Sequence, residues 1–270
     1  MTDGAIRQRH DWRGALLMAS LIACAVAAIL VPAMPQPLSY HAFADCRSLW
    51  SVPNFLNVVS NVPFLVGGAL GLGVIFRGGG AFVDQRESLP YLVFFLGALL
   101  TSIGSSYYHL APDNGRLVWD RLPMTLGFAG LVSAAIADRA DLTWGLRLLW
   151  PLLALGAFTV VYWHAGERIG HGNVIPYGLY QGWSVLAIVM LLGFFRSPRY
   201  SHDSLLVWAA IWYGLAKFFE AFDLATYRAL GGALSGHTIK HLLAAAAVFA
   251  VARQLRLRRA LPDPKLAVPP

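Results

Sequence analysis

Long apolar stretches alternate with short charged or Pro- and Gly-rich segments along the whole chain. A stretch of about 20 residues with few charges is long enough to cross a bilayer as a helix. The pattern therefore predicts an all-α, polytopic bundle of membrane-spanning helices. The eight expected helices span residues 14–33, 54–76, 89–110, 119–137, 146–164, 174–195, 204–223 and 237–253.

The composition supports the membrane assignment. Of the 270 residues, 57% are hydrophobic and only 13% are charged, and the mean hydropathy is +0.56. A soluble domain carries about 25% charged residues, so lipid must cover much of the surface of this chain. No linker divides the sequence. We expect one membrane domain, with a tail, one helix and an outer loop in 1–53, seven helices in 54–253 and a basic tail in 254–270.

The first apolar stretch could also belong to a signal peptide, because Arg7, Arg9 and Arg13 precede it. However, residues 14–31 are long for the apolar part of a signal peptide, and the cleavage motif near "AFA" is weak. We therefore expect the helix to be retained.

The basic residues set the expected orientation. The net charge of +7 comes from residues that flank the apolar stretches, which is typical of anchoring on the cytoplasmic side and not of nucleic-acid binding. Loops on alternate sides differ in Lys and Arg content, and both termini fall on the richer side, so both are expected in the cytoplasm. The residues on this side are Arg7, Arg9, Arg13, Arg77, Arg86, Arg139, Arg147, Arg196, Arg199, Arg253, Arg256, Arg258, Arg259 and Lys265.

Polar residues interrupt several expected helices at one depth. The helix 89–110 ends with "GSSYYHL", which puts Ser105 and His109 four residues apart on one face. The next helix starts with Asp120, and the last starts with "SGHTIKHLL", in which His237 and His241 are also four apart. The expected orientation places all of these on the non-cytoplasmic side. Ionisable residues at membrane depth usually mark function.

Three imidazoles and a carboxylate at a common depth predict a zinc site, with His109, His237 and His241 as ligands and an open position for water. The His-Glu-x-x-His pattern of zinc proteases is absent, since Thr238 follows His237, and Asp120 is the nearest candidate base. A His pair at this spacing also arises by chance, and a single His at a membrane boundary is often only interfacial. Both interpretations stay open at this point.

These residues resemble the alkaline ceramidase family, within the superfamily that also holds the adiponectin/progestin-type (PAQR) receptors. The matching features are Ser105-x-x-x-His109, the aspartate that follows, and the His-x-x-x-His of the last helix. In addition, "FLNVVSN" from Phe55 to Asn61 looks like the family's Phe-x-Asn-x-x-Ser-Asn signature.

The resemblance implies a zinc-dependent hydrolase that cleaves the amide bond of ceramide or a related N-acyl lipid. On this basis the three histidines bind zinc, Asp120 orients or deprotonates the zinc-bound water, and Ser105 stabilises the oxyanion. The resemblance also places the helix 14–33 outside a core of seven helices. The expected partners are a membrane-embedded lipid amide and the bilayer, with no nucleic acid and no protein partner.

Two departures from the family concern calcium and a disulfide. Asp45 matches an acidic calcium site, but Arg47 is basic where the family has an acid, and Asn54 stands where it has Glu. Calcium prefers several carboxylate oxygens, so we do not expect calcium here. Cys24 lies in a helix and Cys46 in a loop, so no disulfide is expected.

Other polar residues have two interpretations each. Lys217, Glu220 and Asp223 share a face of the helix 204–223, where they could hold a histidine ring by its second nitrogen or form a structural ion pair. Asn57 and Ser60 could support the site or hydrogen-bond between helices.

Three functions therefore compete. The first is an integral-membrane zinc amidase of sphingolipid metabolism, compatible with a bacterial inner membrane. The second is a PAQR-like receptor or sensor that holds zinc without turnover. The third is a transporter that uses Lys217, Glu220 and Asp223 as a proton relay, although the sequence has no inverted repeat.

Overall fold

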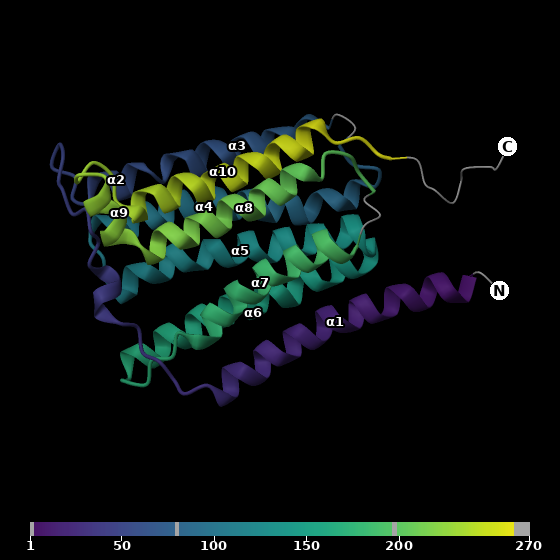
Figure 1. Ribbon diagram of the computed structural model, residues 1–270, viewed down its shortest axis with the longest axis horizontal. Helices are drawn as coiled ribbons and strands as arrows, with labels where there is room; N and C mark the ends of the chain where they lie inside the picture. The colour runs from purple at the N-terminus through teal and green to yellow at the C-terminus, as the bar shows by residue number, and fades with distance from the viewer. Residues whose placement is uncertain (1–2, 79–80, 196–198, 262–270) are drawn as a thin grey trace.

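The helices of this chain run side by side and form one elongated bundle (Figure 1). The computed structural model describes residues 3–78, 81–195 and 199–261, which contain no β-strand. In chain order the elements are α1 (Asp3–Leu30), the 3₁₀ helix η1 (Leu38–His41), α2 (Phe55–Val59), α3 (Val62–Arg77), η2 (Gln85–Glu87), α4 (Ser88–Leu110), α5 (Asn114–Arg139), α6 (Leu142–Arg168), α7 (Ile175–Phe194), α8 (Ser204–Ala221), α9 (Asp223–Ala229) and α10 (Gly236–Leu257).

Six spans in the described part of the chain are long and apolar enough to cross a membrane, and the bent pair α8–α9 makes up to seven. This number of apolar helices indicates a membrane protein. The sequence also predicts a span at 119–137, but α5 is not among the six. Charged residues near both its ends shorten its apolar part, and α5 packs against α4, α6 and α7, which shield it.

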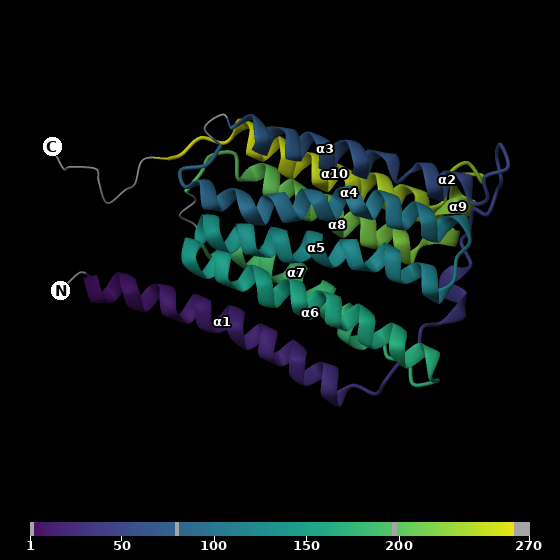
Figure 2. The same ribbon diagram turned by 180° about the vertical axis from the view of Figure 1, so that it is seen from behind.

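Two expected helices are broken. The helix expected over 54–76 divides into α2 and α3 at Ser60 and Asn61, and Pro63 lies in the first turn of α3, where its missing N–H is not needed. The helix expected over 204–223 ends at Ala221, and α9 leaves it at an angle of 85°. Both breaks lie at the same end of the bundle, the end that holds α2 and α9 (Figure 2).

The N-terminal helix α1 lies at the edge of the bundle (Figures 1 and 2). None of the residues in its most apolar window is buried. It packs mainly against α7, where Trp183 Nε1 donates to Ser20 Oγ over 3.1 Å. The apolar surface of α1 is therefore left for lipid.

Close packing of α4 on α5 fixes the height of the polar residues on both helices. A side chain at Gly104 of α4 would clash with the Trp119 carbonyl oxygen of α5. Only glycine permits this approach, which brings Ser105 beside the turn that carries Asp120.

A buried ionic cluster closes the end of the bundle that lies opposite α2 and α9. Arg258 Nη1 lies 2.7 Å from Asp138 Oδ2, which also accepts from the Tyr91 hydroxyl over 2.7 Å. Arg258 Nε donates to the Ala81 carbonyl oxygen over 2.6 Å. The sequence places Arg258 in the basic tail 254–270, but the structure buries its side chain, because Asp138 supplies a partner inside the bundle.

The predicted basic tail of 254–270 also begins later than expected, since α10 continues to Leu257. Residues 262–270 lie outside the described residues, and so do Arg196 and Lys265, which contribute to the predicted orientation. The start of α1 and the end of α10 nevertheless lie at the same end of the bundle (Figure 1).

Candidate metal centre

Three histidines from two helices meet at the end of the bundle that holds α2 and α9. His109 lies in the last turn of α4, and His237 and His241 lie in the first two turns of α10. All three are buried, and their ligand atoms lie within 4.8 Å of one another. Nε2 of His109 and Nε2 of His237 are 3.3 Å apart. The structure thus brings the three predicted ligands together in a cluster that could hold a metal ion.

Ser60 fixes the orientation of the His241 ring. Its hydroxyl donates to the Asn57 carbonyl oxygen over 3.2 Å and lies 2.8 Å from His241 Nδ1. Because the hydroxyl proton is engaged by the carbonyl, the hydroxyl accepts from Nδ1–H. The lone pair on Nε2 of His241 is then available to a metal ion, which is the usual way that a protein orients a histidine ligand.

Asn57 joins α2 to α10 and to the outer loop. Its side chain is fully buried, with 0% exposed. Oδ1 accepts from Thr238 Oγ1 over 2.9 Å, and Nδ2 donates to the Asp45 carbonyl oxygen over 3.1 Å. The Asn57 amide therefore fixes the position of the first turn of α10, which carries His237, relative to the outer loop.

The first turn of α10 is held from two sides. Ser235 caps the helix, since its hydroxyl accepts from the Thr238 N–H over 3.0 Å. Asp223 accepts from the His237 N–H over 2.8 Å and from the Ala44 N–H over 2.9 Å. Asp223 therefore supports the site through backbone groups. It does not hold a histidine ring by its second nitrogen, which was one of the two interpretations that the sequence left open.

Glu220 is placed between two lysines. It forms ion pairs with Lys217 and with Lys240, whose Nζ lies 2.8 Å from Glu220 Oε1. The bend between α8 and α9 separates Glu220 from Asp223, so the two acids have different partners.

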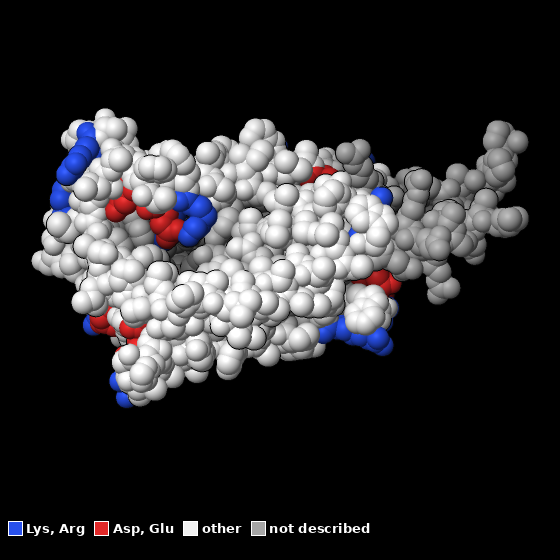
Figure 3. All heavy atoms as spheres, turned by 60° about the horizontal axis from the view of Figure 1, so that its bottom comes forward, with Lys and Arg blue, Asp and Glu red and all other residues white. Residues whose placement is uncertain are grey.

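On one face of the molecule, acidic and basic side chains gather beside a hollow in a surface that is otherwise largely uncharged (Figure 3).

The outer loop between α1 and α2 covers the histidines. The Phe43 ring lies 4.7 Å from the His109 ring and 4.6 Å from the His237 ring, between centroids. Nearby, His41 Nδ1 lies 2.8 Å from the Tyr108 hydroxyl. Neither the Phe43 nor the His41 contact has a signal in the sequence, because aromatic residues in a loop have no periodicity that would reveal what they pack against.

A pair of charged residues stabilises the same loop. Arg47 Nε and Nη2 donate to the two oxygens of Asp45 over 2.8 and 2.7 Å. These hydrogen bonds lower the pKa of the Asp45 carboxyl below its usual value. The carboxylate that resembles a calcium ligand is therefore paired with a guanidinium.

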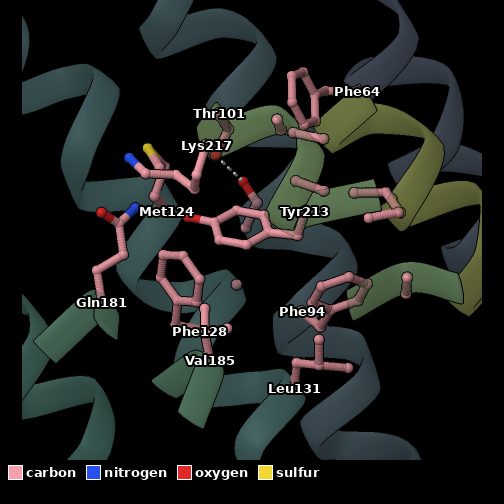
Figure 4. Close-up of a pocket in the computed structure, with 18 of the residues that line it drawn as sticks. Phe64, Phe94, Thr101, Met124, Phe128, Leu131, Gln181, Val185, Tyr213 and Lys217 are labelled. Atoms are coloured by element: carbon pink, nitrogen blue, oxygen red, sulfur yellow. Dashed lines mark hydrogen bonds between the residues drawn. The ribbon is translucent and has the colours of Figure 1, made fainter. Parts of the chain in front are cut away.

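The predicted base and its neighbouring hydroxyl line a cavity inside the bundle. Asp120 and Ser105 are buried, with 7% and 2% exposed, and both line the cavity together with His241. The rest of the lining is mostly apolar and continues along α10 to Val251. Figure 4 shows some of the side chains that surround the cavity, among them Phe64, Phe94, Phe128, Leu131 and Tyr213.

Comparison with known proteins adds no relative. No protein-family model matches the chain, and a search of curated proteins finds no match.

Proposed function

We propose that this chain is a zinc-dependent membrane hydrolase that cleaves the amide bond of ceramide or a related N-acyl lipid. The observation that carries the proposal is the convergence of three buried imidazoles, one of which, His241, lines an apolar cavity together with Asp120 and Ser105. The resemblance of the same residues to the alkaline ceramidase pattern supports it.

The donor set fits zinc. Three neutral imidazoles are typical of catalytic zinc sites, which leave a fourth position open for water. The Nε2 atoms of His109 and His237 face each other at 3.3 Å in a buried site, and a shared cation would satisfy both. When bound, zinc supplies a Lewis acid and lowers the pKa of water to about 7.

The protein residues have separate tasks in this proposal. Asp120 accepts a proton from the attacking water and passes it to the leaving nitrogen, as a general base and then a general acid. Ser105 donates a hydrogen bond to the carbonyl oxygen, on which negative charge develops. Phe43 packs over the histidine rings and excludes bulk water from them.

The apolar cavity suits an acyl chain. From His241 to Val251 the lining follows α10 over ten residue steps, about 15 Å at the rise of an α-helix. A lipid that stays in the bilayer can place its chain here and its amide at the histidines. This arrangement favours a lipid amide over a small water-soluble substrate.

The proposal is tested with protein purified in detergent. We expect about one zinc per chain by elemental analysis, and hydrolysis of an N-acyl sphingoid base. Asp120→Asn should keep zinc and lose activity by about a hundredfold or more, whereas His237→Ala should lose zinc as well. His171→Ala, which changes an exposed histidine, serves as the control.

Two results would count against the hydrolase. One is an Asp120→Asn variant that hydrolyses as fast as the wild type. The other is a wild-type protein that holds zinc and binds lipid but turns nothing over, which would instead favour a receptor or sensor.

A further inference from the structure

One buried basic side chain at the cavity has no task in the mechanism above. Arg121 of α5 is only 4% exposed. Its Cζ lies 4.3 Å from the Trp163 ring centroid and 4.7 Å from that of Tyr177, and its Nη2 donates to Gln36 Oε1 over 2.7 Å. The aromatic rings hold the guanidinium in place without neutralising its charge.

The other terminal nitrogen of this guanidinium is unsatisfied. Nη1 of Arg121 is buried and has no hydrogen-bond partner among the described residues. Within the same part of the chain, no carboxylate forms an ion pair with Arg121. A buried charge without a partner is costly, so a bound ligand that supplies the partner would be favoured.

The surrounding charges also favour an anion. Arg121 lines the same cavity as Asp120, Lys217, Glu220 and Lys240, a set with one more positive than negative charge. Glu220 is already shared by the two lysines. A divalent ion at the histidines would add further positive charge to this end of the cavity.

We propose that Arg121 binds a carboxylate of the substrate, and that the substrate class is therefore N-acyl amino acids. The inference rests on the proposed function, since it places the scissile amide at the histidines and the acyl chain in the apolar part of the cavity. The carboxylate of an N-acyl amino acid lies one carbon from the amide nitrogen, so it stays at the polar end. A guanidinium is suited to this group because its fork of N–H donors matches a carboxylate.

Two matched lipids test the proposal. N-palmitoylglycine and N-palmitoylethanolamine share the acyl chain and the amide and differ in a carboxylate against a hydroxymethyl group. Calorimetric titration of the zinc-loaded wild type in detergent should show at least about tenfold tighter binding of the glycine conjugate, as expected for a charge-assisted contact.

Three variants test whether Arg121 causes the preference for the glycine conjugate. Arg121→Gln should abolish the preference, and Arg121→Lys, which keeps the charge but not the fork, should retain part of it. Arg168→Gln, on an exposed arginine that does not line the cavity, should keep the full preference.

The outcomes separate this inference from the hydrolase proposal. Equal binding of the two lipids by the wild type, or a preference that persists in Arg121→Gln, overturns the inference even if both lipids are hydrolysed. A preference that depends on Arg121 in a protein that hydrolyses neither lipid supports the binding site and counts against the hydrolase.

Discussion

Individual polar side chains decide how the imidazoles are presented. Ser60 donates to a backbone carbonyl and accepts from His241, which leaves Nε2 of that ring facing the other two histidines. Asn57 and Asp223 position the histidines without bonding to their rings. Asn57 accepts a hydrogen bond from the Thr238 hydroxyl, and Asp223 accepts one from the His237 N–H. The site therefore depends on groups that would not touch the metal themselves.

Removal of the Ser60 hydroxyl should weaken metal binding. In Ser60→Ala, Nδ1 of His241 loses the hydroxyl that lies 2.8 Å away, and loss of such a partner typically lowers metal affinity by about 10–100-fold. Zinc affinity is measured by competition with a chelating dye. Ser106→Ala is the control, because Ser106 donates to the Val58 carbonyl oxygen over 3.3 Å and does not contact a histidine. Equal affinities in wild type and Ser60→Ala would refute this role.

At the scale of whole helices, close contacts set the relative heights of the functional residues. Gly104 allows the α4 backbone to approach α5, and the same contact aligns Ser105 with Asp120. At the opposite end, Arg258 joins the end of α10 to α4 and α5. These contacts lie in different parts of the bundle and can be tested separately.

Gly104→Ala should destabilise the bundle. The added methyl group would overlap the Trp119 carbonyl oxygen, and overpacking of this kind costs about 1–3 kcal/mol. We expect a lower melting temperature in detergent and reduced activity. Gly73→Ala in α3, where a methyl group would meet no atom within 4 Å, should not destabilise. Equal melting temperatures for the two variants would argue against the tight α4–α5 contact.

Arg258→Met should be strongly destabilising. The change leaves Asp138 buried without its cation, and breaking a buried pair in this way costs about 3–5 kcal/mol. Arg256→Met, which changes an exposed arginine in the last turn of α10, should have little effect on thermal unfolding. If both variants unfold like the wild type, the Arg258–Asp138 pair does not hold this end together.

For the molecule as a whole, the helix arrangement and the distribution of basic residues point to one orientation. The start of α1 and the end of α10 share one end of the bundle, and the histidines lie at the other (Figure 1). The positive-inside rule then puts the histidines on the non-cytoplasmic side. This orientation remains a prediction from charge.

The two cysteines allow a direct test of the orientation. Cys46 is exposed in the outer loop, and Cys24 lies within α1. A membrane-impermeant maleimide should label wild type and Cys24→Ser in intact spheroplasts, and should not label Cys46→Ser. Labelling of Cys46 in inverted vesicles but not in spheroplasts would show that the outer loop lies on the cytoplasmic side, which contradicts the predicted orientation.

The sequence by itself determined the features that depend on neighbours along the chain. Apolar runs gave the positions of the helices, and a spacing of four placed His237 beside His241 and Ser105 beside His109. The break before α3 was not predicted, since one helix was expected over 54–76, although Pro63 is a local signal for it. Such features follow from backbone geometry and hydrophobicity within a few turns, so no partner segment is needed to predict them.

Only the tertiary structure decided which of these elements meet. His109 and His237 are 128 positions apart in the chain, and Phe43 covers both. Arg258 was counted from the sequence as a charge that orients the chain, yet it is buried in the bundle, and Arg121 is buried as well. Whether an arginine faces water, a carboxylate or an aromatic ring depends on packing between helices, because each partner comes from a distant part of the chain.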